Sequence, residues 1–162
     1  MSNTPTTTPD PVIAELSHFY GGGEVRTSEW LEVTQEHMDQ FAEVTHDPDW
    51  MHIDPERARR DGPFEGTIAF GFWTMSLLTP FSRQIIGGDY PPAGSYGFNY
   101  GFNRLRLMAP VPIGSRIRCR MKLLGVEPRG EGRYLMCSEN SIEIEGEEKP
   151  AAVIETVVVY YP

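Results

Sequence analysis

The sequence predicts an α+β fold in which an antiparallel sheet wraps around one buried helix. Helical signals are confined to the first half of the 162-residue chain, and one helical segment is apolar on nearly every side. Four segments of the second half alternate between apolar and polar residues, as half-buried strands do. Short turns separate these segments, so consecutive strands are expected to be antiparallel neighbours packed on the apolar helix.

Three helices are expected in the first half of the chain. The first begins after Thr34, a suitable N-cap, and has apolar residues at helical spacing. The second begins after Asp54, with a proline as its first residue, and ends near Gly62. The third covers residues 68–81 and is apolar almost all round, so it is expected to be buried. Pro80 is expected to kink or end its regular part.

The four predicted strands are separated by segments rich in glycine and proline. The strands are expected at residues 96–108, 115–126, 133–144 and 151–161.

The composition of the chain bears on its domain organisation and on its cellular compartment. Residues 1–11 are rich in threonine and proline and predict a disordered tail rather than a signal peptide, which leaves residues 12–162 as one domain. No apolar run approaches the ~20 residues that a membrane span needs. The two cysteines, Cys119 and Cys137, lie in strand-like segments and do not make a disulfide framework. A soluble, cytoplasmic protein with reduced thiols is therefore expected.

The net charge of −9 argues against a nucleic-acid partner, because phosphate backbones are bound by basic surfaces. The charge is uneven, since residues 103–126 contain six basic residues and no acidic one. Two interpretations stay open for this cluster: an ordinary solvated sheet face, or a binding site for the phosphates of coenzyme A. The basic residues are Arg104, Arg106, Arg116, Arg118, Arg120 and Lys122.

Asp47 and His52 are separated by four residues in a predicted turn between two helices. A carboxylate and an imidazole held together on such a loop can bind one water and handle its two protons separately. From the spacing alone, a structural interpretation stays open in which Asp47 opens a turn and His52 packs in the core. A metal site is conceivable because His46 and Asp49 are close in sequence to this pair, but no zinc-type spacing is present and no metal is expected.

Residues 41–58 and 63–72 resemble the MaoC-like dehydratases, the family of (R)-specific enoyl-CoA hydratases. The resemblance is strongest to the branch that includes the nodulation-protein-N-like dehydratases. The shared pattern is an aspartate, four residues, a histidine, an alanine, and a loop rich in Phe and Gly before the buried helix. Here the three named positions are Asp47, His52 and Ala58. Residues in two further segments, 99–106 and 109–115, are similar to that branch, and the likeness runs from about residue 25 to residue 161.

The resemblance implies a hot dog fold, assembled as a homodimer, and the reversible hydration of a trans-2-enoyl-CoA to an (R)-3-hydroxyacyl-CoA. Asp47 would take a proton from water as the water attacks the β-carbon, while His52 would hold that water and relay a proton. Which of the two protonates the α-carbon stays open. The backbone N–H of Gly71 would bind the thioester oxygen, a task that a helix N-terminus suits.

No metal or redox cofactor is implied by the resemblance, and coenzyme A enters as part of the substrate. Further substrate contacts are expected near the helix entry and from the basic strands. These residues are Phe70, Phe72, Arg104, Arg106 and Arg116.

The chain departs from the family pattern in three places. His46 stands where a glycine commonly precedes the aspartate, and Asp49-Trp50 stand where Asn-Pro is common. Phe70 replaces the histidine of the usual Ile-Ala-His-Gly at the helix entry. The first and last changes add bulk near the predicted site and put the range of substrates in question, but they leave the Asp47–His52 pair intact.

Two alternatives remain. A thioesterase could share the fold and the thioester substrate, but hot dog thioesterases often carry an acidic residue on the central helix, and residues 67–82 contain none. A non-catalytic acyl-thioester-binding subunit, paired with another hot dog protein, would explain unusual residues at the site. The presence of both proton-transfer residues in one chain favours an enzyme.

Overall fold

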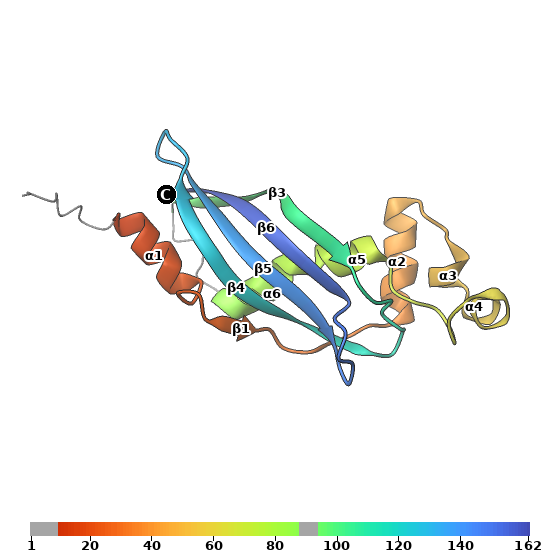
Figure 1. Cartoon of the computed structure of the whole chain (residues 1–162). Coiled ribbons are helices and arrows are strands. Elements are labelled where there is room, and N and C mark those ends of the chain that lie inside the picture. Colours follow the sequence, from red (N-terminus) through yellow and green to blue (C-terminus); the bar gives the residue numbers. More distant parts are fainter. Residues whose placement is uncertain (1–9, 88–93) are drawn as a thin grey trace, which may run out of the picture.

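The computed structural model describes residues 10–87 and 94–162, which form a curved sheet around a central pair of helices (Figure 1). The strands are β1 (Val25–Thr27), β2 (Leu31–Glu32), β3 (Tyr96–Leu107), β4 (Arg116–Pro128), β5 (Tyr134–Ile144) and β6 (Ala152–Tyr161). Their order is β1-β4-β5-β6-β3, and β2 pairs with β4 outside this path. All the named pairings are antiparallel. The predicted α+β class, the four long strands and the hot dog architecture are confirmed.

Helix α1 (Pro11–Phe19) lies in a segment for which the sequence predicts no helix. The Asp10 carboxylate caps it by accepting hydrogen bonds from the backbone N–H groups of Val12 and Ile13, at 2.9 and 3.4 Å. Proline is well suited to the first helical position because its missing N–H would have no partner there. Asp10 and Pro11 therefore belong to this helix start and not to the predicted tail, and residues 1–9 lie outside the described residues.

Helices α2 (Gln35–Thr45) and α4 (Pro55–Asp61) begin where the sequence predicts. The side chains of the predicted caps, Thr34 and Asp54, each accept a hydrogen bond from a backbone N–H three residues later. Between them lies a four-residue helix, α3 (Trp50–Ile53). The predicted turn between two helices thus contains one helical turn of its own.

The prediction of one central helix over residues 68–81 is wrong in two respects. The segment forms two helices, α5 (Gly71–Ser76) and α6 (Leu78–Ile86), and the break precedes Pro80. Pro80 is the third residue of α6, where an N–H has no acceptor within the helix, so the proline is accommodated instead of causing a kink. The pair is also not buried on every side, since the side chain of Phe72 is 77% exposed.

Strand β3 does not neighbour β4, although the short connection of residues 108–115 predicts an antiparallel pair. It pairs with β6 at the other end of the sheet. The connection is bound to the segment before α5, because Ala69 N–H donates to the Val111 carbonyl at 2.8 Å and Ile113 N–H donates to the Thr67 carbonyl at 3.1 Å. It therefore passes the start of α5 on its way from one side of the sheet to the other (Figure 1).

The core lies between the sheet and the central helix pair. Cys119 belongs to this core, and burial raises the pKa of its thiol to about 12. Cys137 is half-buried, and burial together with a hydrogen bond to Glu155 raises its pKa to about 11. Both cysteines are free thiols. Within the described residues, no helix is long and apolar enough to cross a membrane. Other core residues on the sheet are Ile117, Met121, Met136, Ile142 and Ile154.

Candidate active site

His52 lies on α3, and two contacts fix its ring. Nδ1 is 2.7 Å from the backbone oxygen of Ile68, and the ring centroid lies 3.8 Å from that of Phe70. A carbonyl oxygen can only accept a hydrogen bond, so Nδ1 carries the hydrogen of the neutral ring and Nε2 is left as the basic nitrogen. The side chain therefore presents a base in a fixed orientation, as general acid–base catalysis requires.

Gln35 binds the backbone of His52. Its Nε2 donates to the carbonyl oxygen of His52 at 2.7 Å, and its Oε1 accepts from the Thr67 hydroxyl at 2.7 Å. The amide thus links the start of α2 to α3 and to the segment that leads into α5. Nothing in the sequence distinguishes this glutamine from an ordinary first residue of a helix, and the sequence does not predict its role.

Asp47 follows the end of α2. Its N–H donates to the carbonyl of Ala42 at 3.1 Å, and the N–H of His46 donates to the carbonyl of Glu43 at 3.4 Å. With His46 in the left-handed conformation, at a φ of 57°, these bonds form a Schellman motif. The Asp47 side chain is exposed, and across residues 10–87 and 94–162 no hydrogen bond joins it to His52. The motif therefore anchors the backbone of Asp47 and leaves its carboxylate in solvent.

His52 and Gly71 line one pocket of about 250 Å³ at the start of α5. Gly71 is the first residue of α5, and in the described part of the chain no side chain caps this helix. N–H groups of its first turn are therefore available to a ligand. A Cβ at position 71 would collide with the side chain of Leu107, which also lines the pocket. Asp47 does not line it. The other lining residues are Ile68, Ala69, Thr74, Met108, Ala109, Pro110, Val111 and Ala151.

The two predicted phenylalanine contacts lie in different environments. Phe70 is only 4% exposed and packs against His52 and Phe41, with ring centroids 3.8 and 5.2 Å apart. Phe72 is directed to the surface. Phe70 therefore acts on the site by covering one face of the His52 ring, while Phe72 offers a large apolar surface beside the start of α5.

The basic residues of positions 103–126 do not form one cluster, which corrects that expectation. Arg104 and Arg106 lie on β3, the other four lie on β4, and strands β5 and β6 separate the two groups. Three arginines of β4 are paired with Glu143 of β5 or with Glu145 in the turn that follows it, which supports the solvated-face interpretation for that strand. The pairs are Arg116–Glu145 at 3.1 Å, Arg118–Glu143 at 2.7 Å and Arg120–Glu143 at 3.3 Å.

Known proteins share this fold and this sequence pattern. Residues 20–143 match the family model described as MaoC like domain. The chain belongs to the MaoC-like domain family. It is 44% identical over 140 residues to 3-hydroxyacyl-thioester dehydratase Z of Mycobacterium tuberculosis (strain ATCC 25618 / H37Rv), a match that covers 86% of this chain and 89% of that protein.

A second relative is Nodulation protein N of Rhizobium leguminosarum bv. viciae. It is 40% identical over 138 residues, which cover 85% of this chain and 84% of that protein. Among solved structures, the (R)-hydratase from A. caviae involved in PHA biosynthesis matches with a TM-score of 0.64 and 21% identity, over 84% of this chain and 93% of that chain. The resemblance predicted from the sequence is confirmed.

The structure explains two departures from the MaoC-like pattern. The position of Asp49-Trp50 is the N-cap and first residue of α3, and the Asp49 carboxylate accepts from the Met51 N–H at 3.0 Å. Asparagine followed by proline suits the same two positions for the same reasons. Asp49 is thus a cap, and within the described residues no group of three or more His, Cys, Asp or Glu side chains is placed to hold a metal ion.

His46 occupies the left-handed position of the Schellman motif, where the MaoC-like domain family commonly has glycine. Left-handed backbone costs an ordinary residue about 1–2 kcal/mol, and glycine avoids this cost while losing some entropy on folding. We expect His46→Gly to raise the free energy of unfolding by about 0.5–1 kcal/mol. Denaturant unfolding checks this, with Val44→Gly, inside α2, as the control that should destabilise. A destabilised His46→Gly variant would show that the His46 side chain contributes more than its backbone conformation costs.

Proposed function

We propose that the chain catalyses the reversible hydration of a trans-2-enoyl-CoA to an (R)-3-hydroxyacyl-CoA. The observation that carries this proposal is the pocket lined by both His52, with Nε2 as its basic nitrogen, and Gly71, with an uncapped helix start. The 44% identity to a protein named 3-hydroxyacyl-thioester dehydratase Z supports the same reaction class. Water is added without a change of oxidation state, so the proposed reaction needs no redox cofactor, and coenzyme A is part of the substrate.

In the proposed mechanism, Asp47 and His52 act on one water. The water oxygen bonds to the β-carbon as one of its O–H bonds breaks, and a proton is delivered to the α-carbon. The net reaction adds one water molecule across the double bond. His52 is oriented for this by its Nδ1 hydrogen bond to Ile68. The Asp47 carboxylate is in solvent in the isolated chain, and the proposal requires it to turn toward the pocket when substrate binds, since catalytic hydrogen bonds often tighten only in the complex.

Gly71 supplies the third part of the proposed mechanism. Negative charge develops on the thioester oxygen when the β-carbon is attacked. A backbone N–H in the first turn of α5 can donate to that oxygen, and the absence of a Cβ lets the thioester approach the backbone. Arg104 and Arg106, on the strand that ends at the pocket residue Leu107, are the proposed contacts for the coenzyme A phosphates. Arg116 is a weaker candidate because Glu145 already pairs with it.

We further propose that the chain forms a homodimer through β3 and works in the cytoplasm, where its two free thiols stay reduced. Within the described residues, β3 pairs with β6 on one side and with no strand on the other. Long apolar edge strands such as this one readily pair with a second chain. Tyr100 and Phe102 are 64% and 53% exposed there.

The dimer can be tested by mutating the exposed edge. Phe102→Lys is expected to convert the protein from twice the chain mass to the chain mass in sedimentation equilibrium, because a charge opposes burial of the edge. Val44→Lys removes an apolar side chain on α2 that is 74% exposed, and it should leave the dimer intact. A monomeric wild type, or a dimeric Phe102→Lys variant, would contradict dimerisation through β3.

The stereochemistry tests the proposed reaction itself. The enzyme is mixed with (R)- or (S)-3-hydroxybutyryl-CoA, and the appearance of the enoyl-thioester absorbance is followed. The proposal predicts dehydration of the (R) isomer alone. Reaction of the (S) isomer would overturn the stereochemical assignment, and release of free thiol from either ester would identify a thioesterase.

A further inference from the structure

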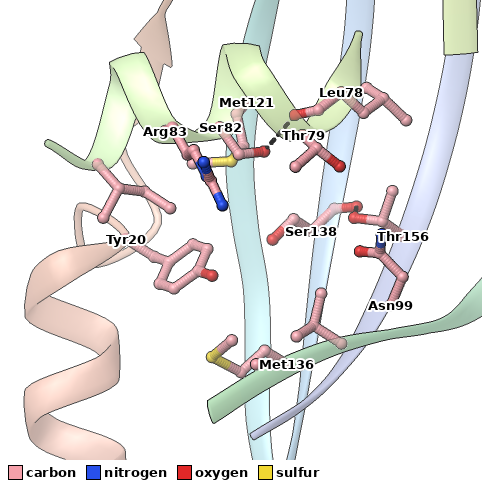
Figure 2. Close-up of a pocket in the computed structure, with 13 residues that line it drawn as sticks. Tyr20, Leu78, Thr79, Ser82, Arg83, Asn99, Met121, Met136, Ser138 and Thr156 are labelled. Atoms are coloured by element: carbon pink, nitrogen blue, oxygen red, sulfur yellow. Dashed lines mark hydrogen bonds between the residues drawn. The ribbon is translucent and has the colours of Figure 1, made fainter. Parts of the chain in front are cut away.

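A second cavity, of about 210 Å³, lies between α6 and the sheet and shares no lining residue with the His52 pocket. Figure 2 shows it bounded by α6 above, the sheet strands on one side, and Tyr20 at the end of α1 on the other. Its walls combine apolar side chains such as Met121 and Met136 with several polar ones. The polar lining residues other than Tyr20 are Thr79, Ser82, Arg83, Asn99, Ser138 and Thr156.

The sheet wall of this cavity contains polar residues where the neighbouring positions of the core are apolar. Ser138 is only 5% exposed. Its backbone carbonyl accepts from the Asn140 amide at 3.1 Å and from the Thr156 hydroxyl at 3.4 Å, but its own hydroxyl makes no hydrogen bond within the described residues. Within the described residues, every buried side-chain N or O atom has a hydrogen-bond partner. The Ser138 hydroxyl has none, so it is not enclosed in the core but faces the cavity (Figure 2). A hydroxyl that faces the cavity can hydrogen-bond a polar ligand there.

The helix wall contributes a cation. Figure 2 shows the guanidinium of Arg83 directed from α6 into the space between Tyr20 and Ser138. Within the described residues the Arg83 guanidinium forms no ion pair or hydrogen bond, and no acidic side chain lines the cavity. The arginines of β4 differ from it, because they form ion pairs with Glu143 and Glu145. A planar guanidinium beside hydroxyl and amide groups recognises a carboxylate.

Both cavities are lined by strand β3 and by the central helix pair. Strand β3 contributes Leu107 to the His52 pocket and Asn99 to the second cavity, while the central helix pair contributes Gly71 to the first and Thr79 and Arg83 to the second. The distance along the helices from Gly71 to Thr79 or Arg83 is about 12–18 Å. An extended chain of roughly ten to fourteen carbons covers that distance.

We propose that this cavity receives the distal end of the acyl group and selects acyl chains that end in a carboxylate. The inference rests on the proposed function and names its substrate class, the thioester of an unsaturated dicarboxylic acid. The thioester end of this substrate binds at Gly71, and the free carboxylate at the other end binds Arg83. The apolar residues of the cavity pack on the methylene groups, and Ser138 and Asn99 hydrogen-bond the carboxylate.

The test compares trans-2-dodecenedioyl-CoA with trans-2-dodecenoyl-CoA, which differ only at the distal end. Wild type is expected to have the higher kcat/KM for the dicarboxylic ester. Arg83→Gln should lower the ratio of the two kcat/KM values about tenfold, since a hydrogen bond to a charged group is lost. Ser138→Ala should lower the same ratio less, because it removes a neutral hydroxyl. Arg120→Gln, on the outer side of β4, removes the same charge and should leave the ratio unchanged.

Crotonyl-CoA is measured beside the two long esters, because it is too short to reach the second cavity. If wild type hydrates crotonyl-CoA but shows no preference for the dicarboxylic ester, or if Arg83→Gln keeps the wild-type ratio, the inference about Arg83 is overturned and the proposed function stands. If wild type hydrates none of the three esters, the proposed function fails and the inference fails with it.

Discussion

Replacing His52 with alanine is expected to lower kcat for hydration of crotonyl-CoA by roughly 10²–10⁴-fold, the range for loss of a general acid–base. The reason is geometric as well as chemical. The Nδ1 hydrogen bond to Ile68 commits that nitrogen as a donor, so the ring has one basic atom, Nε2, and no other side chain in the pocket can replace it. The initial rate is read from the loss of enoyl-thioester absorbance.

Controls separate this chemical role from a structural one. His52 also packs on Phe70, so alanine can disturb the core near the site. His52→Gln keeps a side-chain donor, and circular dichroism with thermal melting shows whether each variant is folded. His18→Ala, an exposed histidine on α1, should keep full activity. A folded His52→Ala variant with wild-type kcat would remove His52 from the mechanism.

Asp47→Asn is expected to lower kcat by a similar factor, roughly 10²–10⁴-fold, while leaving the fold intact. The amide has nearly the shape of the carboxylate but cannot accept a proton from water. Because the Asp47 side chain is exposed and forms no hydrogen bond within the described residues, its change should alter the free energy of unfolding by less than about 0.5 kcal/mol. Loss of activity without loss of stability would therefore indicate a chemical role.

The matched control for Asp47 is Glu43→Gln, which removes an exposed carboxylate from the end of α2, the helix that precedes Asp47. It should retain wild-type kcat and KM. Equal losses in both variants would indicate that the negative charge of this region matters and not the Asp47 carboxylate itself. An Asp47→Asn variant as active as wild type would leave His52 as the single acid–base group of the mechanism.

Features that depend on neighbours in the sequence could be predicted from the sequence. Thr34 and Asp54 cap α2 and α4 because an N-cap acts on the N–H groups of the next turn. The long strands lie within two residues of their predicted bounds because glycine and proline end them. The same local signal was present at Asp10-Pro11, but the polar composition of the preceding residues favoured a tail.

Features that depend on distant residues could not be predicted. Strand β3 pairs with β6 because residues 67–69 hold the connection that follows β3, and no local pattern specifies that contact. The arginines of β4 form ion pairs with Glu143 on the next strand and with Glu145 in the turn after it. The role of Gln35 depends on His52 and Thr67, which reach it only in the folded chain.

The features of the candidate site also divide into those that the sequence predicts and those that depend on the folded structure. The sequence pattern identifies His52 and Gly71, and the structure brings both to one pocket. The orientation of the His52 ring, the burial of Phe70 and the left-handed conformation of His46 follow from packing and backbone geometry. These three features explain the site more fully than the residue types alone.

The most direct measurement follows the enoyl-thioester absorbance and free thiol in parallel, with crotonyl-CoA and equal amounts of wild type, His52→Ala and Asp47→Asn. We predict that wild type removes the absorbance without releasing thiol, and that both variants are slowed by at least about a hundredfold. Thiol release by wild type, or an unchanged rate in both variants, would contradict water addition by Asp47 and His52.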